Sequence, residues 1–261
     1  MKIRTLALAA VLALSMASTS ALAFGAERFA ADKVQVDNLL GSLVIKVVEG
    51  VDGITVQAEG KDKDLLRRLS VTGRGDKVVI DMDIPRGEDR NYDLDDNQTP
   101  TVTVTVPSGA DLRIVDMIGA LEAESGLDEV DISLNSAASM EFGRVRTLLV
   151  DAKGALNLEV GDIADGFDLA MEGAGNIETG AIVGATRVNV KGMSNVDIAR
   201  VDGPLVIALD GIGRVNVEDG RSEMLEVELD GLGSISYGGV ATDKRVSKGG
   251  MGSVSIAVRA Y

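Results

Sequence analysis

From about residue 130 onward, one pattern of apolar and polar positions recurs along the chain. It reads apolar-x-apolar-x-apolar-x-Gly-x-small-x-apolar-x-apolar, and its clearest copies span residues 205–217 and 225–237. Strict alternation of apolar and polar residues is typical of β-strands that bury one side. Each copy therefore predicts two short strands that flank a glycine.

The glycine position, which we call the anchor, repeats at near-constant spacing. The anchors are Ser136, Gly154, Gly173, Gly192, Gly211, Gly231 and Gly250, at steps of 18, 19, 19, 19, 20 and 19 residues. One such repeat cannot bury its own apolar side and has no room for a helix, so the copies must stack. The sequence predicts an all-β fold, a parallel β-helix or β-solenoid with about 19 residues and three short strands per coil. The anchors would be corners that need unusual backbone angles or a close approach.

The alternation also predicts which side chains point into the core. The first inward column contains Ile132, Val150, Leu169, Val188, Ile207, Val227 and Val246. The second contains Met140, Leu158, Ile177, Val196, Val215, Ile235 and Val254. The third contains Phe142, Val160, Thr179, Ile198, Val217, Tyr237 and Ile256. Lys244 and Lys248 take positions that are apolar in earlier copies, so we expect the last coil to be frayed or solvent-facing on one side.

The chain divides into three parts on this pattern: residues 1–23, a β-rich but less regular part with the first coils at 24–129, and the regular solenoid at 130–261. Strands in the middle part are predicted at residues 43–48, 54–58, 78–84, 101–106 and 112–115. Residues 63–69 predict one or two helical turns. Residues 85–100 are polar, charged and bounded by prolines, which indicates a loop.

Residues 1–23 have the pattern of a secretory signal peptide. Lys2 and Arg4 precede an uncharged stretch, and a small-residue cleavage pattern ends at Ala23. We therefore expect export to the periplasm or to the outside of the cell. No later stretch is long and apolar enough for a transmembrane helix, so none is expected after signal cleavage.

Composition narrows the chemistry. The chain has no His, Cys or Trp, which excludes disulfides, zinc sites of the usual nitrogen and sulfur kind, and Ser-His-Asp or Cys-His nucleophiles. Its net charge is −15, whereas nucleic-acid binding depends on clustered Lys and Arg. We therefore expect no nucleic-acid partner. The 31 glycines follow largely from the corners of the coils.

The glycine-rich coils resemble the head GIN domain family, whose members are named as putative auto-transporter adhesins. The residues that carry the resemblance are GAGNIETG at 173–180, GIGRVNVEDG at 211–220, GLGSISYGG at 231–239 and GMGSVSIAV at 250–258. The segment from residue 53 to 82, together with TVTVTVPSGADLRI at 101–114, is similar to related bacterial adhesin β-repeat domains. The resemblance implies a right-handed β-helix-like fold in an exported protein and implies little chemistry.

One column of acidic residues is the candidate binding site. The fifth position after the anchor holds Glu141, Glu159, Glu178 and Asp197, and equivalent positions of successive coils become neighbours in space. One interpretation is a solvated acidic surface whose like charges repel one another. The other is a strip that binds divalent cations or a cationic partner. No other cofactor is expected.

Two further columns are predicted to hold the coils in register. Asn157, Asn176 and Asn195 follow their anchors by three residues and would form a ladder of amide hydrogen bonds. The position before the anchor alternates in sign, with Lys153, Glu172, Lys191 and Asp210. Across neighbouring coils this alternation predicts a ladder of ion pairs.

These features favour an exported, non-enzymatic β-solenoid that acts as an adhesin-like binding protein or an envelope scaffold, with an unidentified envelope or surface ligand. One alternative is a polysaccharide-active β-helix enzyme, for which Arg144 and Arg146 could lie near Glu141 and Glu159. The other alternative is a structural protein that self-associates by stacking its coils end to end.

Overall fold

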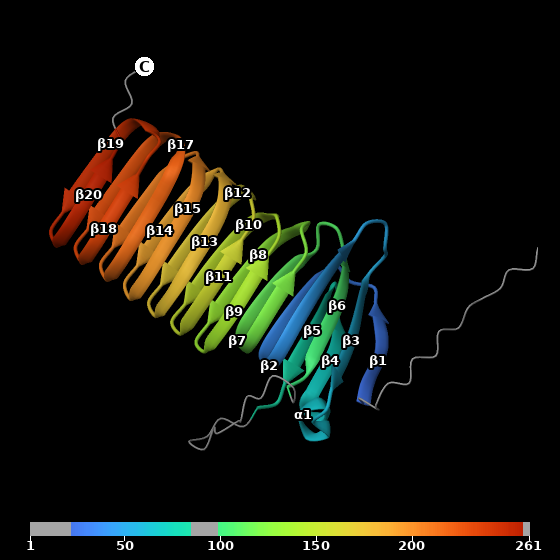
Figure 1. Cartoon of the computed structure of the whole chain (residues 1–261). Helices are drawn as coiled ribbons and strands as arrows, with labels where there is room; N and C mark the ends of the chain where they lie inside the picture. The colour runs from blue at the N-terminus through green and yellow to red at the C-terminus, as the bar shows by residue number, and fades with distance from the viewer. Residues whose placement is uncertain (1–21, 85–98, 258–261) are drawn as a thin grey trace, which may run out of the picture.

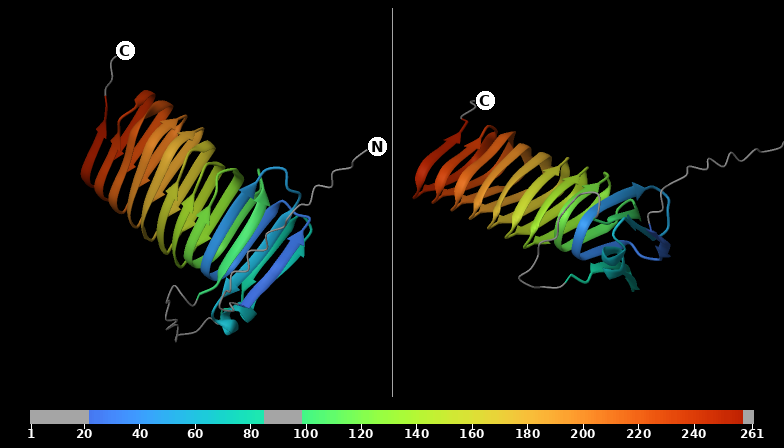
Figure 2. Two further views of the ribbon diagram at one scale, coloured as in Figure 1. Left: turned by 45° about the vertical axis from the view of Figure 1, so that its right-hand side comes forward. Right: turned by 60° about the horizontal axis from the view of Figure 1, so that its bottom comes forward.

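The computed structural model describes residues 22–84 and 99–257 of the chain. Its strands wind into a β-solenoid of about eight turns with roughly 19 residues per turn, as the repeat predicts. Figures 1 and 2 show the coils stacked along one axis into a straight rod, with the N-terminal strands at one end and the C-terminal strands at the other. Nearly all of the predicted signal peptide and residues 85–98 of the predicted loop lie outside the described residues.

Two broad sheets form the sides of the rod, and each coil contributes one strand to each sheet. Face 1 contains β8 (Leu127–Leu134), β10 (Val145–Ala152), β12 (Ile163–Met171), β14 (Ala185–Val190), β16 (Leu205–Leu209), the end of β17 (Ile212–Leu229) and β19 (Val240–Lys248). Face 2 contains β9 (Ala137–Phe142), β11 (Ala155–Val160), β13 (Ala174–Val183), β15 (Met193–Asp202), the start of β17, β18 (Leu232–Tyr237) and β20 (Met251–Ile256). All pairings between these strands are parallel.

The three predicted inward columns are confirmed by the register. In the first column Val150 pairs with Leu169 and Leu169 with Val188. In the second and third, Leu158 pairs with Ile177 and Val160 with Thr179. Side chains in the middle of the columns are almost completely buried. Stacked aliphatic side chains thus form one continuous core, whose burial contributes roughly 25 cal/mol for each Å² of apolar surface.

The anchors are needed for close approach between coils. The anchors Gly173, Gly192 and Gly211 do not have positive φ angles. A Cβ added to Gly192 would overlap the carbonyl oxygen of Gly173 in the coil before it, and the same holds between Gly211 and Gly192. Of the two reasons that the sequence suggested for these glycines, the structure supports the close approach.

The N-terminal coils are stacked out of sequence order. β2 (Lys33–Val48) has β7 (Asp111–Ala123) on one side, parallel to it from Lys33 to Ile45. On its other side lie two shorter strands, β5 (Lys77–Met82) and β6 (Thr101–Pro107), which pair with its first and second halves. β7 in turn pairs with β8 and β9, so parallel coils continue from β2 into the regular solenoid. The strand of the second coil, β2, therefore comes earlier in the sequence than β5 and β6, which form the coil before it in space.

Antiparallel strands cover this end of the rod. β3 (Ile54–Gly60) pairs antiparallel with β6, β1 (Leu22–Phe29) with β3, and β4 (Leu69–Arg74) with β5. The short helix α1 (Lys63–Arg68) begins where the Asp62 carboxylate accepts hydrogen bonds from two backbone N–H groups, at 2.8 and 3.1 Å. The five predicted strands and the helical turn are present, whereas β1, β4 and residues 33–42 of β2 were not predicted.

The C-terminal coil is open. Lys244 and Lys248 pair in register with the buried Leu225 and Leu229, yet every residue of β19 from Thr242 onward is exposed. The prediction of a solvent-facing last coil is confirmed. Charged side chains at inward positions of an edge strand discourage pairing with another sheet edge.

Candidate functional site

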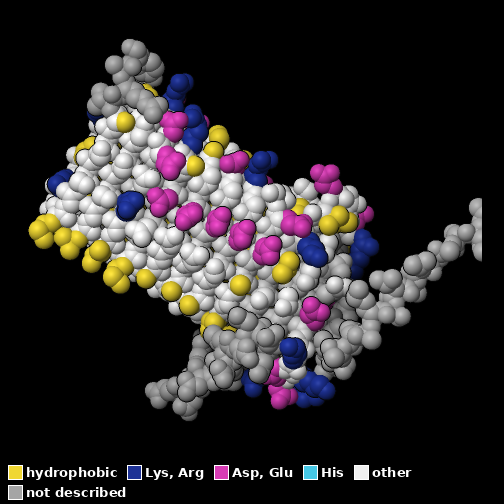
Figure 3. Space-filling model, viewed as in Figure 1, with side chains coloured by type: hydrophobic (Ala, Val, Ile, Leu, Met, Phe, Trp, Pro, Cys, Tyr) yellow, Lys and Arg dark blue, Asp and Glu magenta, His cyan; other side chains and the backbone are white. Residues whose placement is uncertain are grey.

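The predicted acidic column exists as a row on face 2. Glu141 pairs in register with Glu159, Glu159 with Glu178, and Glu178 with Asp197. β7 adds a fifth member that the sequence reading missed, because Glu122 pairs with Glu141. Figure 3 shows this row of acidic side chains running along face 2. We call these five residues the acidic row.

Hydrogen bonds hold part of the acidic row in place. The Asn216 amide donates to the Asp197 carboxylate at 3.2 Å, and the Asn176 amide donates to Glu178 at 3.2 Å. Asp197 is half-buried, whereas the four glutamates are exposed. Among the described residues, no group of three or more acidic side chains converges as a metal site would require. The row is thus a line of separate carboxylates, one per coil at about 4.8 Å spacing.

The asparagine column is in register but does not form the expected ladder. Asn157 pairs with Asn176, and Asn176 with Asn195. However, the Asn157 amide donates to the hydroxyl of Ser139 at 3.5 Å, and Asn176 donates to Glu178 instead of to an amide. For Asn157 and Asn176 the predicted amide-to-amide bond is therefore wrong, because their amides donate to oxygen acceptors of Ser139 and Glu178 on the same face.

The alternating charges before the anchors do not form the predicted ladder of ion pairs. Lys153, Glu172, Lys191 and Asp210 are all exposed, and none of them forms an ion pair within the described residues. They lie at the corner between face 1 and face 2, where the side chains point into solvent. This column remains available to a partner.

The ion pairs of the solenoid lie elsewhere, and many lie on the short third side, where each coil returns from face 2 to face 1, as at Ala181, Arg200 and Asp219. Arg144 pairs with Asp162 at 3.7 Å, and Arg146 lies between Asp128 and Asp165. Arg146 therefore forms its ion pairs with these two aspartates and not with Glu141 or Glu159. The grouping that the enzyme alternative required is not formed, since both arginines pair with aspartates of neighbouring coils.

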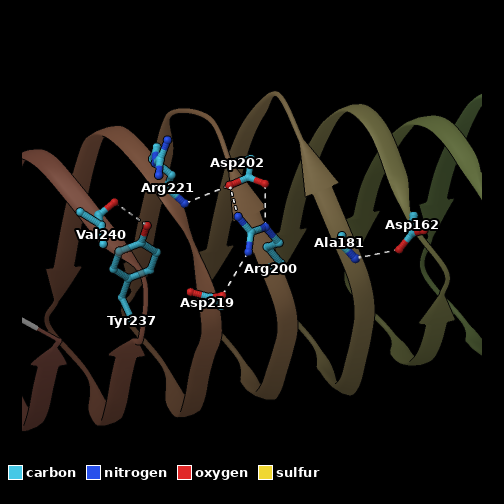
Figure 4. A network of polar contacts seen from close by, with 8 residues as sticks. All are labelled: Asp162, Ala181, Arg200, Asp202, Asp219, Arg221, Tyr237 and Val240. Carbon is cyan, nitrogen blue, oxygen red and sulfur yellow. Dashed lines mark hydrogen bonds and ion pairs between the residues drawn. The ribbon is translucent and has the colours of Figure 1, made fainter. Parts of the chain in front are cut away.

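Arg200 also bridges neighbouring coils (Figure 4). Arg200 donates to Asp202 at 2.7 and 3.1 Å and to Asp219 in the next coil at 3.1 Å. The Arg200 guanidinium, through these hydrogen bonds, holds the pKa of Asp202 below its ordinary value. The side chains are about 40% exposed, so the pair contributes little to stability. We interpret the network as one that fixes the corner.

An exposed apolar row, which the sequence reading missed, runs along the corner between the two faces. The residue after each anchor points outward, and register joins Ala137, Ala155, Ala174, Met193, Ile212, Leu232 and Met251. We call these seven residues the apolar edge, and Figure 3 shows a row of hydrophobic side chains along this edge of the rod. The four large side chains are 63%, 53%, 44% and 77% exposed, in chain order. The sequence could have indicated this row, because the position after the anchor holds a large apolar residue in each of the last four repeats.

The chain is similar in fold to solved structures of adhesin-like proteins. A "putative adhesin" from Bacteroides fragilis matches with 16% identity and a TM-score of 0.52, covering 92% of this chain and 98% of the other. A second from Parabacteroides distasonis matches with 14% identity and a TM-score of 0.51, covering 89% and 96%. At these identities the likeness shows the fold alone. No family model matches the chain, and no curated protein matches it.

The resemblance to the head GIN domain family accordingly stays a prediction, while the adhesin-like fold is established by the solved structures. Within the described part of the chain, no helix is long and apolar enough to cross a membrane.

Proposed function

We propose that this chain is an exported, non-enzymatic binding protein that presents face 2, with its acidic row, to a cationic partner at the cell envelope. The observation that carries the proposal is the row itself: four exposed glutamates and Asp197 in consecutive coils, to which no Lys or Arg of residues 22–84 and 99–257 is paired. A line of like charges repels itself, and a cation or a cationic partner relieves that repulsion.

The rod shape supports a binding role. Parallel coils give a flat, rigid sheet on which one side chain per coil repeats at fixed spacing, and extended surfaces of this kind bind extended partners. The adhesin-like fold of the two solved structures is consistent with this role. The arginines that a polysaccharide-directed site would use are engaged by Asp128, Asp162 and Asp165, which weighs against the enzyme alternative.

The end-to-end stacking alternative receives less support. β1 and β4 cover the N-terminal end with antiparallel strands, so this end does not continue the parallel stack. The C-terminal end carries Lys244 and Lys248 at inward positions, where another coil would have to bury them.

Export and binding can be tested separately. Cell fractionation with mass spectrometry should find a mature chain that begins at Phe24 in the periplasm or outside the cell. An intact chain that stays in the cytoplasm would contradict export.

For binding, the purified chain is compared with the row variant E141Q/E159Q/E178Q/D197N on isolated cell envelopes. The control E218Q/E223Q/E226Q/E228Q removes the same charge from exposed positions outside the acidic row. We expect binding that weakens as salt rises, is lost in the row variant and is kept in the control. Equal binding by all three proteins would refute the role of the acidic row, and release of reducing sugar from envelope polysaccharide would refute the non-enzymatic role.

A further inference from the structure

The apolar edge changes character halfway along the rod. Its first half consists of Ala137, Ala155 and Ala174, which line a shallow hollow of about 600 Å³ together with Gly175. Its second half consists of the large side chains of Met193, Ile212, Leu232 and Met251, which stand out from the corner. One surface thus carries a trough and, continuous with it, a ridge of similar length.

A two-fold axis makes these two halves complementary. If a second copy lies antiparallel along the corner, with the axis between the coils of Ala174 and Met193, the first three ridge residues lie in the other copy's trough, and Met251 lies beyond it, beside Ile118 at the end of the hollow. Met193 then meets Ala174 of the partner copy, Ile212 meets Ala155, and Leu232 meets Ala137. A two-fold interface uses the same patch on both copies, as this surface requires.

The unpaired charges beside the ridge follow the same register. An axis at this point places Lys191 opposite Glu172 of the partner copy, and Asp210 opposite Lys153. The position beyond them pairs Asp230 with the uncharged Asn135. All of these side chains are exposed, and none has an ion pair with another residue that the structure describes.

Shifting the register by one coil removes this match. A shift in one direction places Lys191 opposite Lys191 of the partner copy, and Asp210 opposite Glu172 of the partner copy. A shift in the other direction places Glu172 opposite Glu172 of the partner copy, and Lys191 opposite Lys153 of the partner copy. Like charges across an interface disfavour the wrong register. The arrangement that fits large to small side chains is therefore also the one that fits charge to charge.

We propose that the chain forms an antiparallel, side-by-side homodimer through the apolar edge. Seven coils at about 4.8 Å give a strip about 29 Å long. To reach the roughly 1,000 Å² of total buried area that a specific interface needs, this strip must be about 17 Å wide, so the flanking charged columns take part. Because buried area does not set affinity, the dimer is sought over a wide range of chain concentration.

A second copy fits the apolar edge better than a lipid surface does. Asp210 and Asp230 lie directly beside the ridge, and the chain carries a net charge of −15. Anionic bilayers repel such a surface, whereas the second copy supplies Lys153 and Lys191 at matching positions.

Sedimentation velocity across the micromolar range tests the dimer. We expect concentration-dependent dimerisation that weakens at least tenfold in M193S and in I212S. V183S is the matched control, because Val183 is as exposed as Ile212, at 53%, but lies outside the apolar edge. A chain that stays monomeric throughout, or a dimer that all three variants leave unchanged, would overturn the proposal.

Charge exchange tests the register. K191E should weaken the dimer by placing two acidic side chains opposite each other, and K191E/E172K should restore it. Because the chain has no cysteine, A155C/I212C should give a disulfide-linked dimer on oxidation, whereas A174C/I212C should not. Failure of the charge exchange to restore dimerisation would overturn this register.

Flotation with phosphatidylcholine vesicles tests whether a lipid surface binds the apolar edge instead of a second copy. We expect that the wild-type chain does not float with the vesicles. If it does float, and I212S abolishes the flotation, the ridge is a membrane-binding surface and the dimer proposal is overturned. None of these measurements depends on the acidic row, so the dimer and the proposed binding function fail or stand independently.

Discussion

Replacing the anchor Gly192 by alanine probes the contact that sets the coil spacing. The added Cβ would overlap the carbonyl oxygen of Gly173 and lie 2.7 Å from that of Glu172. The Gly173 carbonyl accepts the N–H of Met193 at 2.9 Å, and the Lys191 N–H donates to Met171 at 2.8 Å. Room for the methyl group can come only from moving these two coils apart.

The cost follows from those two hydrogen bonds and from the crowding. A buried backbone group left without a partner costs about 1–3 kcal/mol. Overpacking typically costs about 1–3 kcal/mol as well. Since the corner is partly exposed and water replaces part of the loss, we expect G192A to lower the free energy of unfolding by about 2–5 kcal/mol, and the melting temperature by roughly 5–15 °C.

Urea unfolding followed by far-ultraviolet circular dichroism measures this change, because the chain has no tryptophan. Gly166 provides the matched control within the same solenoid. A Cβ there would meet one neighbouring atom, the carbonyl oxygen of Ala185 at 3.3 Å. We expect G166A to change stability by less than about 1 kcal/mol. Equal effects of G192A and G166A would refute the conclusion that close approach selects glycine at the anchors.

Three further predictions follow from the core, the arginine bridge and the acidic row. L169A removes a fully buried side chain and should cost about 2–5 kcal/mol in urea unfolding, and a cost below about 1 kcal/mol would contradict the stacked core. R200M should raise the pKa of Asp202, measured by NMR titration, toward its ordinary value of about 3.9. Because the folded-state pKa of Asp202 is lowered, the stability from this pair is present above the unfolded value and is lost as pH falls through the folded one, and an unchanged titration in R200M would contradict the bridge. E159Q should raise the melting temperature slightly at low salt and not at high salt, since it relieves repulsion in the acidic row. Identical melts of the wild-type chain with calcium and with chelator would remove the cation interpretation.

The repeat alone was enough to predict the solenoid and its core. In stacked coils, residues one period apart become neighbours, so spacing along the chain translates directly into contacts. The inward columns, the acidic row and the exposed last coil at Lys244 and Lys248 all followed from this rule. The physical reason is that burial of apolar side chains fixes the register wherever one side of a strand faces the core.

Side-chain partners were less accessible to sequence reasoning. Asn176 was expected to form a hydrogen bond with an amide and instead donates to Glu178. Arg146 was considered as a neighbour of Glu141 and Glu159 and instead pairs with Asp128 and Asp165. Register places the backbone of each residue, whereas the partner of a long polar side chain depends on local distances of an ångström or less. Such differences do not appear in an alternating pattern.

By itself, then, the sequence determined the coil length, the core columns and the line of carboxylates. Only the tertiary structure decided that β2 lies between strands that follow it, and that β1 and β4 cover the N-terminal end. These pairings join segments far apart in the chain through backbone hydrogen bonds that almost any residue can make, so side-chain patterns do not encode them. The tertiary structure also turned four scattered apolar residues, Met193 to Met251, into one ridge beside a trough, because only the stacked register brings them together.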